Sequence, residues 1–394
     1  MERPTNTQET SRNITGKVTS VLVFLALSIL AILGLKWVTS SSSQATDSGV
    51  KENASKANSC SGPLVLAHGF SAYQTNQAKT GFVELDIKDV GELRSFSWSP
   101  DGQRLALVGN TTGRGNIYVA GPTVDQFQLI PVSSELPYLM GAAWSRDGSQ
   151  LIAWEVQHNS TIYLFNQDGG NFRETDLPVQ IFETPQFAPG NESIVFYGVD
   201  DSLSDGLIEA RVDGSQTRMI SDLVENDSSF AWSTDGMRLA YIEMDRNLGE
   251  ARLVAEDIES GSKTTIASLP IPKGSGSSLP ASANLSWSPD GKALVFEFGR
   301  GNSGRVVYLA SVNEKNLVKL VESAHAPAIS ADGKCVAYIS DKQVFLLDLT
   351  VPSTPPTLLA DLPAGRQISD FRLDKLGWGP ESLNAAFQEL ITTQ

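Results

Sequence analysis

A block of apolar and polar positions recurs along the chain from residue 96 onward. Its first copy reads Phe96-Ser-Trp-Ser-Pro-Asp-Gly102, and the apolar run Leu105-Ala-Leu107 follows it. Seven copies align on the residue equivalent to the first tryptophan, at Trp98, Trp144, Phe187, Trp232, Trp287, Ile329 and Trp378. Their intervals of 46, 43, 45, 55, 42 and 49 residues match the roughly 40 to 50 residues of a four-stranded propeller blade. The pattern therefore predicts an all-β repeat fold.

Two adjacent columns of this alignment are apolar in every copy. Seven positions after each centre stand Leu105, Leu151, Ile194, Leu239, Leu294, Val336 and Ala385, and the next column holds Ala106, Ile152, Val195, Ala240, Val295, Ala337 and Ala386. Consecutive apolar residues are typical of a strand that is covered on both faces. We interpret this strand as an inner strand that lies between neighbouring blades, and the recurrent tryptophans as inter-blade core.

An Asp-Gly dipeptide separates the centre from the apolar strand in five copies. The dipeptides are Asp101-Gly102, Asp147-Gly148, Asp235-Gly236, Asp290-Gly291 and Asp332-Gly333. Asp-Gly tolerates the positive φ of a tight hairpin, so we expect these carboxylates to be structural rather than catalytic or metal-binding.

The seventh copy leaves room for two strands before Gln394. Residues 63–67 and 82–85 read as the third and fourth strands that this copy lacks. Pairing the two ends of the chain in one blade would remove the free sheet edges. The sequence therefore predicts a seven-bladed β-propeller with two-plus-two terminal strand closure, and six blades remain the alternative.

The repeated Ser-Pro-Asp-Gly turn after an aromatic residue resembles the WD-like Pro-Asp repeat of TolB-type propeller proteins. The resemblance covers residues 62–394. It implies the propeller fold, and it leaves the function open because propellers serve as binding modules and as enzymes.

The N-terminal region carries a candidate membrane segment. Residues 18–35 are 18 consecutive uncharged and mostly apolar residues, which as a helix would span about 27 Å. Arg3, Arg12 and Lys17 precede it and place the N-terminus in the cytoplasm. We therefore expect a cytoplasmic stub (1–17), a transmembrane signal anchor (18–38), a flexible Ser-rich linker (39–61) and an extracytoplasmic propeller (62–394), periplasmic or on the cell surface. A cleaved signal peptide is the alternative.

Charge and motif content narrow the possible chemistry. The formal net charge is -15, which argues against a nucleic-acid partner. The chain has no Gly-x-Ser-x-Gly, His-Glu-x-x-His or Cys-x-x-Cys motif, and its three histidines fall in different repeats. We therefore expect no catalytic residue, no metal and no cofactor. Cys60 and Cys335 fall in adjoining repeats; whether they pair is open, and two separate thiols are favoured because pairing needs Cα atoms within about 7 Å.

The turns between second and third strands share one face with the turns that lead into the next repeat. On that face acidic residues outnumber basic ones, and we select Asp200, Asp201, Asp205, Asp245, Arg246 and Arg300 as candidate partner-binding residues. The predicted function is a non-catalytic binding or scaffold module for a protein, peptide or glycan of the cell envelope. The alternative is a hydrolase or lyase of unrecognised type with its site at the central channel.

Overall fold

The computed structural model describes most of the repeat region. The described residues are 60, 64–68, 71–75, 81–84, 92–101, 103–111, 114–120, 127–130, 136–155, 160–182, 185–224, 229–245, 249–269, 271, 281–300, 304–351, 355–363 and 375–378. The chain divides into two compact units, Met1–Glu52 and Asn53–Gln394, and all described residues belong to the second. The predicted membrane segment and most of the predicted linker lie outside the described residues. No helix within the described part has the length and apolar character needed to cross a bilayer.

The described strands form seven sheets. The first four groups along the chain are β1 (Leu64–His68), β2 (Ser71–Thr75) and β3 (Phe82–Glu84); β4 (Glu92–Trp98), β5 (Leu105–Thr111), β6 (Arg114–Ala120) and β7 (Phe127–Leu129); β8 (Gly141–Trp144), β9 (Gln150–Trp154), β10 (Thr161–Asn166) and β11 (Arg173–Asp176); β12 (Gln180–Ile181), β13 (Gln186–Phe187), β14 (Ser193–Val199), β15 (Asp205–Arg211) and β16 (Thr217–Ser221). The others are β17 (Phe230–Trp232), β18 (Arg238–Asp245), β19 (Glu250–Asp257) and β20 (Lys263–Leu269); β21 (Ala281–Trp287), β22 (Ala293–Arg300), β23 (Gly304–Ser311) and β24 (Asn316–Glu322); β25 (His325–Ile329), β26 (Cys335–Ser340), β27 (Gln343–Asp348) and β28 (Thr357–Asp361); and β29 (Lys375–Trp378).

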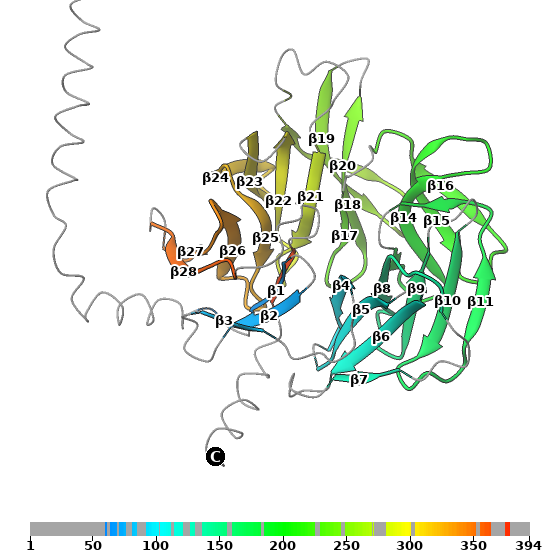
Figure 1. Ribbon diagram of the computed structural model, residues 1–394. Coiled ribbons are helices and arrows are strands. Elements are labelled where there is room, and N and C mark those ends of the chain that lie inside the picture. Colours follow the sequence, from blue (N-terminus) through cyan, green and yellow to red (C-terminus); the bar gives the residue numbers. More distant parts are fainter. Residues whose placement is uncertain are drawn as a thin grey trace, which may run out of the picture. The chain divides into compact units, whose positions relative to one another are not determined.

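Six of these sheets consist of consecutive strands and are blades of an all-β propeller (Figure 1), and the seventh sheet joins strands from both ends of the described chain. First strands of successive sheets contact one another, as β4 with β8, β8 with β13, β17 with β21, and β21 with β25. The link from β13 to β17 is a hydrogen bond in which Gln186 Nε2 donates to the carbonyl oxygen of Phe230 at 2.9 Å. The first strands therefore line the middle of the fold in chain order.

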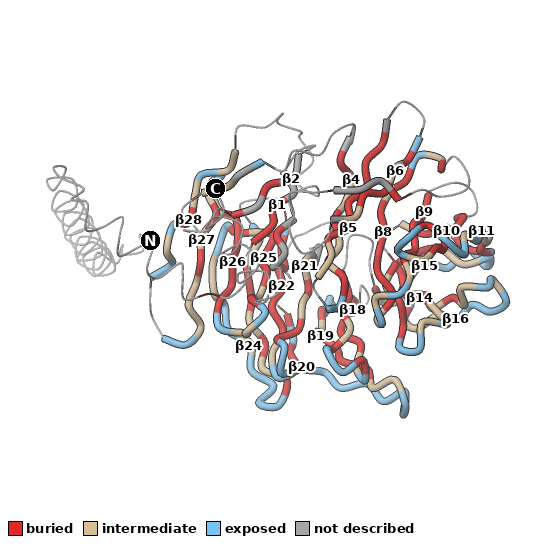
Figure 2. The backbone as a smooth tube through the Cα atoms, turned by 90° about the horizontal axis from the view of Figure 1, so that it is seen from below, coloured by how far each residue is buried: buried red, intermediate tan, exposed pale blue. Residues whose placement is uncertain are grey.

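The predicted apolar columns are buried in the six copies that the structure describes (Figure 2). Each of the two residues in those columns has at most 1% of its surface exposed. The hydrophobic clusters around them each join two neighbouring sheets, for example β8–β11 with β12–β15. The interpretation as inner strands between blades is confirmed for these copies.

The terminal sheet differs from the predicted two-plus-two arrangement. Its order is β29-β1-β2-β3, so one C-terminal strand joins three N-terminal strands. The sequence-based placement of residues 63–67 as a third strand is wrong, because β1 pairs directly with β29, with Leu66 opposite Leu376. Leu64, Val65 and Leu66 are three consecutive buried residues, which is the signature of a second strand. The predicted strand at Ala385 lies outside the described residues.

The terminal sheet has neighbours on both sides. β25 contacts β29, and β2 contacts β4. In Figure 1, β1–β3 lie below the β25–β28 sheet and to the left of β4. The two ends of the described chain therefore meet in one sheet that has the last and the first complete sheets beside it.

The Asp-Gly turns repeat one hydrogen-bond pattern. In the second copy, Asp147 Oδ1 accepts hydrogen bonds from Ser145 Oγ at 2.7 Å and from the Ser149 backbone N–H at 3.0 Å. Ser145 Oγ in turn accepts the Gln150 N–H at 2.9 Å. The hydrogen bond from the serine is the main cause that lowers the pKa of this aspartate, and the same cause acts at Asp101, Asp235 and Asp290. Gly148 has a φ of 71°. The structural role predicted for the aspartates is confirmed.

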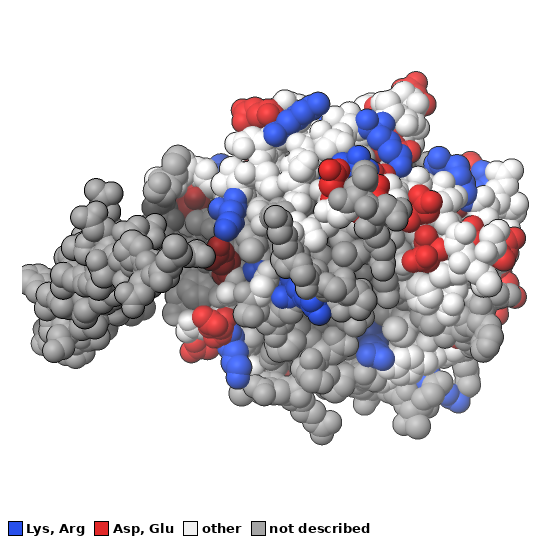
Figure 3. Space-filling view, turned by 90° about the horizontal axis from the view of Figure 1, so that it is seen from above, with Lys and Arg blue, Asp and Glu red and all other residues white. Residues whose placement is uncertain are grey.

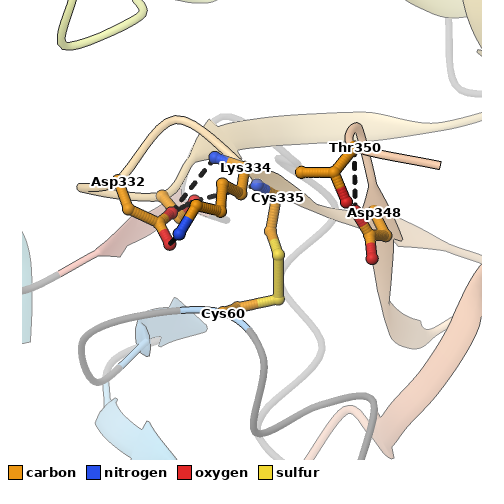
Figure 4. The surroundings of a disulfide bond; sticks show 7 residues. Cys60, Asp332, Lys334, Cys335, Asp348 and Thr350 are labelled. Atoms are coloured by element: carbon orange, nitrogen blue, oxygen red, sulfur yellow. Dashed lines mark hydrogen bonds and ion pairs between the residues drawn. A yellow bond between two sulfur atoms is a disulfide. The ribbon is translucent and has the colours of Figure 1, made fainter.

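Cys60 and Cys335 form a disulfide (Figure 4). Their Cα atoms lie 5.8 Å apart, across a sequence separation of 275 residues. The favoured expectation of two separate thiols is therefore wrong. Cys335 begins β26 directly after the Asp332 turn, and its N–H donates to Ser330 Oγ. The bond ties the segment just before β1 to the neighbouring sheet.

Candidate functional site

The structure places five of the six predicted partner-binding residues on turns of three consecutive sheets. Asp200 and Asp201 lie in the turn between β14 and β15, and Asp205 begins β15. Asp245 ends β18, and Arg300 ends β22. Arg246 lies outside the described residues.

Part of the predicted acidic loop stabilises its own turn. Asp200 Oδ1 accepts the backbone N–H groups of Ser202 and Ser204, both at 2.9 Å. Asp205 Oδ2 accepts the Tyr197 hydroxyl at 2.7 Å. Leu203, at the tip of the turn, is 86% exposed. Figure 3 shows acidic and basic side chains intermixed on one face of the molecule rather than a continuous field of one sign. The partner-binding role of this loop stays a prediction.

Buried carboxylates of the second and third strands have protein partners. Glu155 accepts the Tyr163 hydroxyl, and Glu256 accepts the Tyr241 hydroxyl. Glu243 accepts a hydrogen bond from Ser221 and lies 3.1 Å from Lys263 Nζ. These contacts hold one strand to another, so they account for the burial of the carboxylates without a ligand.

Glu297 in β22 lies in a polar cluster that sequence reasoning missed. Its Oε1 pairs with Arg305 of β23, and its Oε2 accepts the Ala326 N–H at 2.6 Å. Burial raises the pKa of Glu297, although the charges of Arg305 and His325 oppose that shift.

The described residues include no group of three His, Cys, Asp or Glu side chains that could hold a metal ion.

A cavity of roughly 470 Å³ opens where the first strands of four sheets end, on the side of the Asp-Gly turns. Its lining residues are Ser95, Phe96, Ser97, Trp98, Pro100, Ala142, Ala143, Trp144, Arg146, Gln186, Phe187, Trp232, Ser233 and Thr234. We call it the channel-mouth cavity. Its size lies in the range of about 300 to 1,000 Å³ that small-molecule sites occupy.

Arg146 is the one charged residue in that lining. It is partly buried, and its Nη2 donates to the carbonyl oxygens of Ser233 at 3.1 Å and Thr234 at 3.2 Å. The side chain thus reaches from the second repeat to the fourth. Burial lowers the pKa of Arg146, and the nearby Asp235 opposes that shift. No carboxylate of the described residues lies within ion-pair distance of this guanidinium.

Two of the three cavity tryptophans have indole N–H groups without a partner. Trp144 Nε1 donates to the Ser97 carbonyl oxygen of the preceding sheet at 3.0 Å. In the described structure, Trp98 Nε1 and Trp232 Nε1 are buried and make no hydrogen bond, and the same holds for Ser95 Oγ. A buried donor without a partner is costly, so such groups call for an explanation.

Sequence reasoning missed this cavity, although a signal was present. The residue before the Asp-Gly aspartate is Pro100, Thr234, Pro289 or Ala331 in four copies. Arg146 alone puts a charge at that position. A single charged residue in an uncharged repeat column marks the copy that departs from the structural pattern.

Comparisons with known proteins agree on the fold. No protein-family model matches the sequence, and no curated protein matches it either. Among solved structures, the periplasmic gluconolactonase of Pseudomonas aeruginosa is similar with a TM-score of 0.57 and 14% identity, over 81% of this chain and 99% of that one. The oligogalacturonate lyase of Vibrio parahaemolyticus is similar with a TM-score of 0.50 and 12% identity, over 79% of this chain and 89% of that one.

TolB of Acinetobacter baumannii is also among the similar structures. Its TM-score is 0.47 and its identity 16%, over 66% of this chain and 64% of the TolB chain, which is less than two thirds of its length. The similar structures thus include TolB proteins as well as enzymes. At these identities, the likeness establishes the propeller fold and nothing about activity.

Proposed function

We propose that this protein is a membrane-anchored, extracytoplasmic binding module whose seven sheets form one closed ring. Its ligand is a component of the cell envelope, and the channel-mouth cavity is its primary binding site. The acidic turns around Asp200, Asp201 and Asp245 form a second, outer surface for a protein or peptide partner.

One observation carries this proposal. The channel-mouth cavity places the partly buried Arg146 beside the aromatic side chains of Trp98, Trp144 and Trp232. Several described carboxylates outside it, such as Asp147 and Glu243, are engaged in turns and inter-strand bonds. A concave site with a few converging polar groups and aromatic walls is the usual form of a binding site.

The disulfide supports the extracytoplasmic location. Disulfides form and persist in oxidising compartments such as the periplasm and the cell surface. The bond between Cys60 and Cys335 lies in the unit that follows the apolar segment 18–35. Both features fit an N-terminus in the cytoplasm and a propeller outside it.

Binding and turnover measurements on the full-length protein in detergent test the proposal. Envelope glycan fragments and peptides are titrated while tryptophan fluorescence is followed, and the same mixtures, together with sugar lactones and oligogalacturonides, are assayed for product. We expect a saturable fluorescence change and no product. Steady turnover would contradict a non-catalytic role.

The second candidate function is a hydrolase or lyase, because the similar structures include a gluconolactonase and an oligogalacturonate lyase. Turnover of a sugar lactone or an oligogalacturonide that is lost in Arg146→Gln but kept in Arg238→Gln would establish this alternative, since Arg146 lines the cavity and Arg238 does not.

A further inference from the structure

The charged group of the channel-mouth cavity is a hydrogen-bond donor. A guanidinium can only donate. The hydrogen bonds of Arg146 involve its backbone N–H and Nη2, which leaves donors on Nε and Nη1. A ligand that binds Arg146 must therefore offer an acceptor.

The charge in the cavity has the sign that suits an anion. The chain as a whole carries -15, so its long-range field repels anions, and an anionic ligand needs a local cation. Arg146 supplies that cation at a partly buried position. With Nη2 engaged by two carbonyl oxygens, a further N–H of this guanidinium can form a charge-assisted hydrogen bond to a carboxylate.

The remaining lining fits a hydroxylated ligand. Gln186 uses its amide nitrogen to bond the Phe230 carbonyl, and its amide oxygen remains an acceptor that a hydroxyl group can donate to. Trp98, Trp144 and Trp232 give the cavity aromatic walls. Aromatic faces offer apolar surface that matches the C–H faces of a sugar ring.

We propose that the channel-mouth cavity binds a sugar acid, with the carboxylate on Arg146, a hydroxyl on Gln186 and the apolar face of the sugar against the tryptophan walls. The inference rests on the proposed binding function and specifies its ligand class. The same chemistry is offered by a free monosaccharide acid and by the end of an acidic polysaccharide.

Calorimetric titration of the full-length protein with defined probes tests this inference. The probes are glucuronate, a glucuronate-ended disaccharide, glucuronate methyl ester, glucose and an acetylated tri-alanine with a free carboxylate. We expect glucuronate to bind at least tenfold more tightly than its methyl ester or glucose, because a hydrogen bond to a charged group contributes about 1.5 to 3 kcal/mol. Tighter binding of the disaccharide would identify the polysaccharide end as the source, and equal binding the free acid.

Matched variants assign the effect to the cavity. Arg146→Gln is expected to weaken glucuronate binding at least tenfold, and Arg146→Lys to restore much of it. Arg238→Gln is the control, because Arg238 also donates to a turn carbonyl, that of Gly291, but lies outside the cavity lining. Trp232→Phe should weaken binding severalfold. Trp154→Phe should not, since Trp154 lies outside the cavity lining.

Three results would overturn the inference: glucose binding as tightly as glucuronate, binding of the peptide alone, or equal losses in Arg146→Gln and Arg238→Gln. If the protein binds no sugar acid but still shows saturable binding of envelope material without turnover, the sugar-acid assignment is refuted and the binding function stands. Absence of both kinds of binding would refute both.

Discussion

Leu376→Asp is expected to unfold the propeller or to lower its melting temperature by more than any surface change. Leu376 is 5% exposed in β29 and packs in one cluster with Leu64, Leu66 and Cys335. Truncating a buried leucine costs about 2 to 5 kcal/mol, and burying an unpaired carboxylate adds to that. The total approaches the 5 to 15 kcal/mol stability of a typical domain. Thermal and urea unfolding measure the effect.

Leu358→Asp is the matched control. Leu358 lies on β28 of the neighbouring sheet and is 42% exposed, so we expect a change within about 0.5 kcal/mol. If the ring had six blades and β29 were a dispensable tail, Leu376→Asp would also be nearly silent. Equal stability of the two variants would therefore contradict the seven-bladed ring.

Removing the disulfide is expected to have the second largest effect. Replacing both Cys60 and Cys335 by serine releases a cross-link across 275 residues. Long loops gain the most from cross-linking in the chain-entropy account, and loss of a native disulfide typically costs about 2 to 5 kcal/mol. Urea unfolding of the oxidised wild type and of the double variant measures the difference.

The reduced wild type is the internal control for that comparison. It should unfold at the same urea concentration as the double variant, because both lack only the cross-link. If oxidised wild type and double variant unfold together, the disulfide does not stabilise the terminal sheet against its neighbour.

Much of the fold could be predicted from the sequence because the blade signals are local. The Ser-x-Asp-Gly turn and the two apolar columns lie within a few residues of each centre, and hydrogen bonds such as that from Ser145 to Asp147 span two residues. The terminal sheet was harder to predict because strand order depends on pairing between distant segments. Residues 64–66 have the apolar pattern of a second strand, but a short apolar run does not by itself indicate which position the strand takes in its sheet.

The candidate site could not be predicted as a constellation. Arg146 meets Ser233 and Thr234 across 87 and 88 residues. The indole N–H of Trp144 donates to the Ser97 carbonyl oxygen, whereas the indole N–H groups of Trp98 and Trp232 have no such partner in the described structure. Only the folded chain shows this difference. The pairing of Cys60 with Cys335 likewise depended on a Cα distance that only the folded chain supplies.

The central claim is that the ligand enters at the channel-mouth cavity, and photo-crosslinking in growing cells tests it most directly. A benzophenone amino acid is placed at Thr234, an exposed residue on the cavity lining, or at Leu203, the exposed tip of the acidic turn on β14–β15. After irradiation, the full-length protein is purified and its mass analysed for envelope-derived adducts. The account predicts adducts at Thr234 that disappear when Arg146→Gln is added. Adducts confined to Leu203, or none at either position, would contradict it.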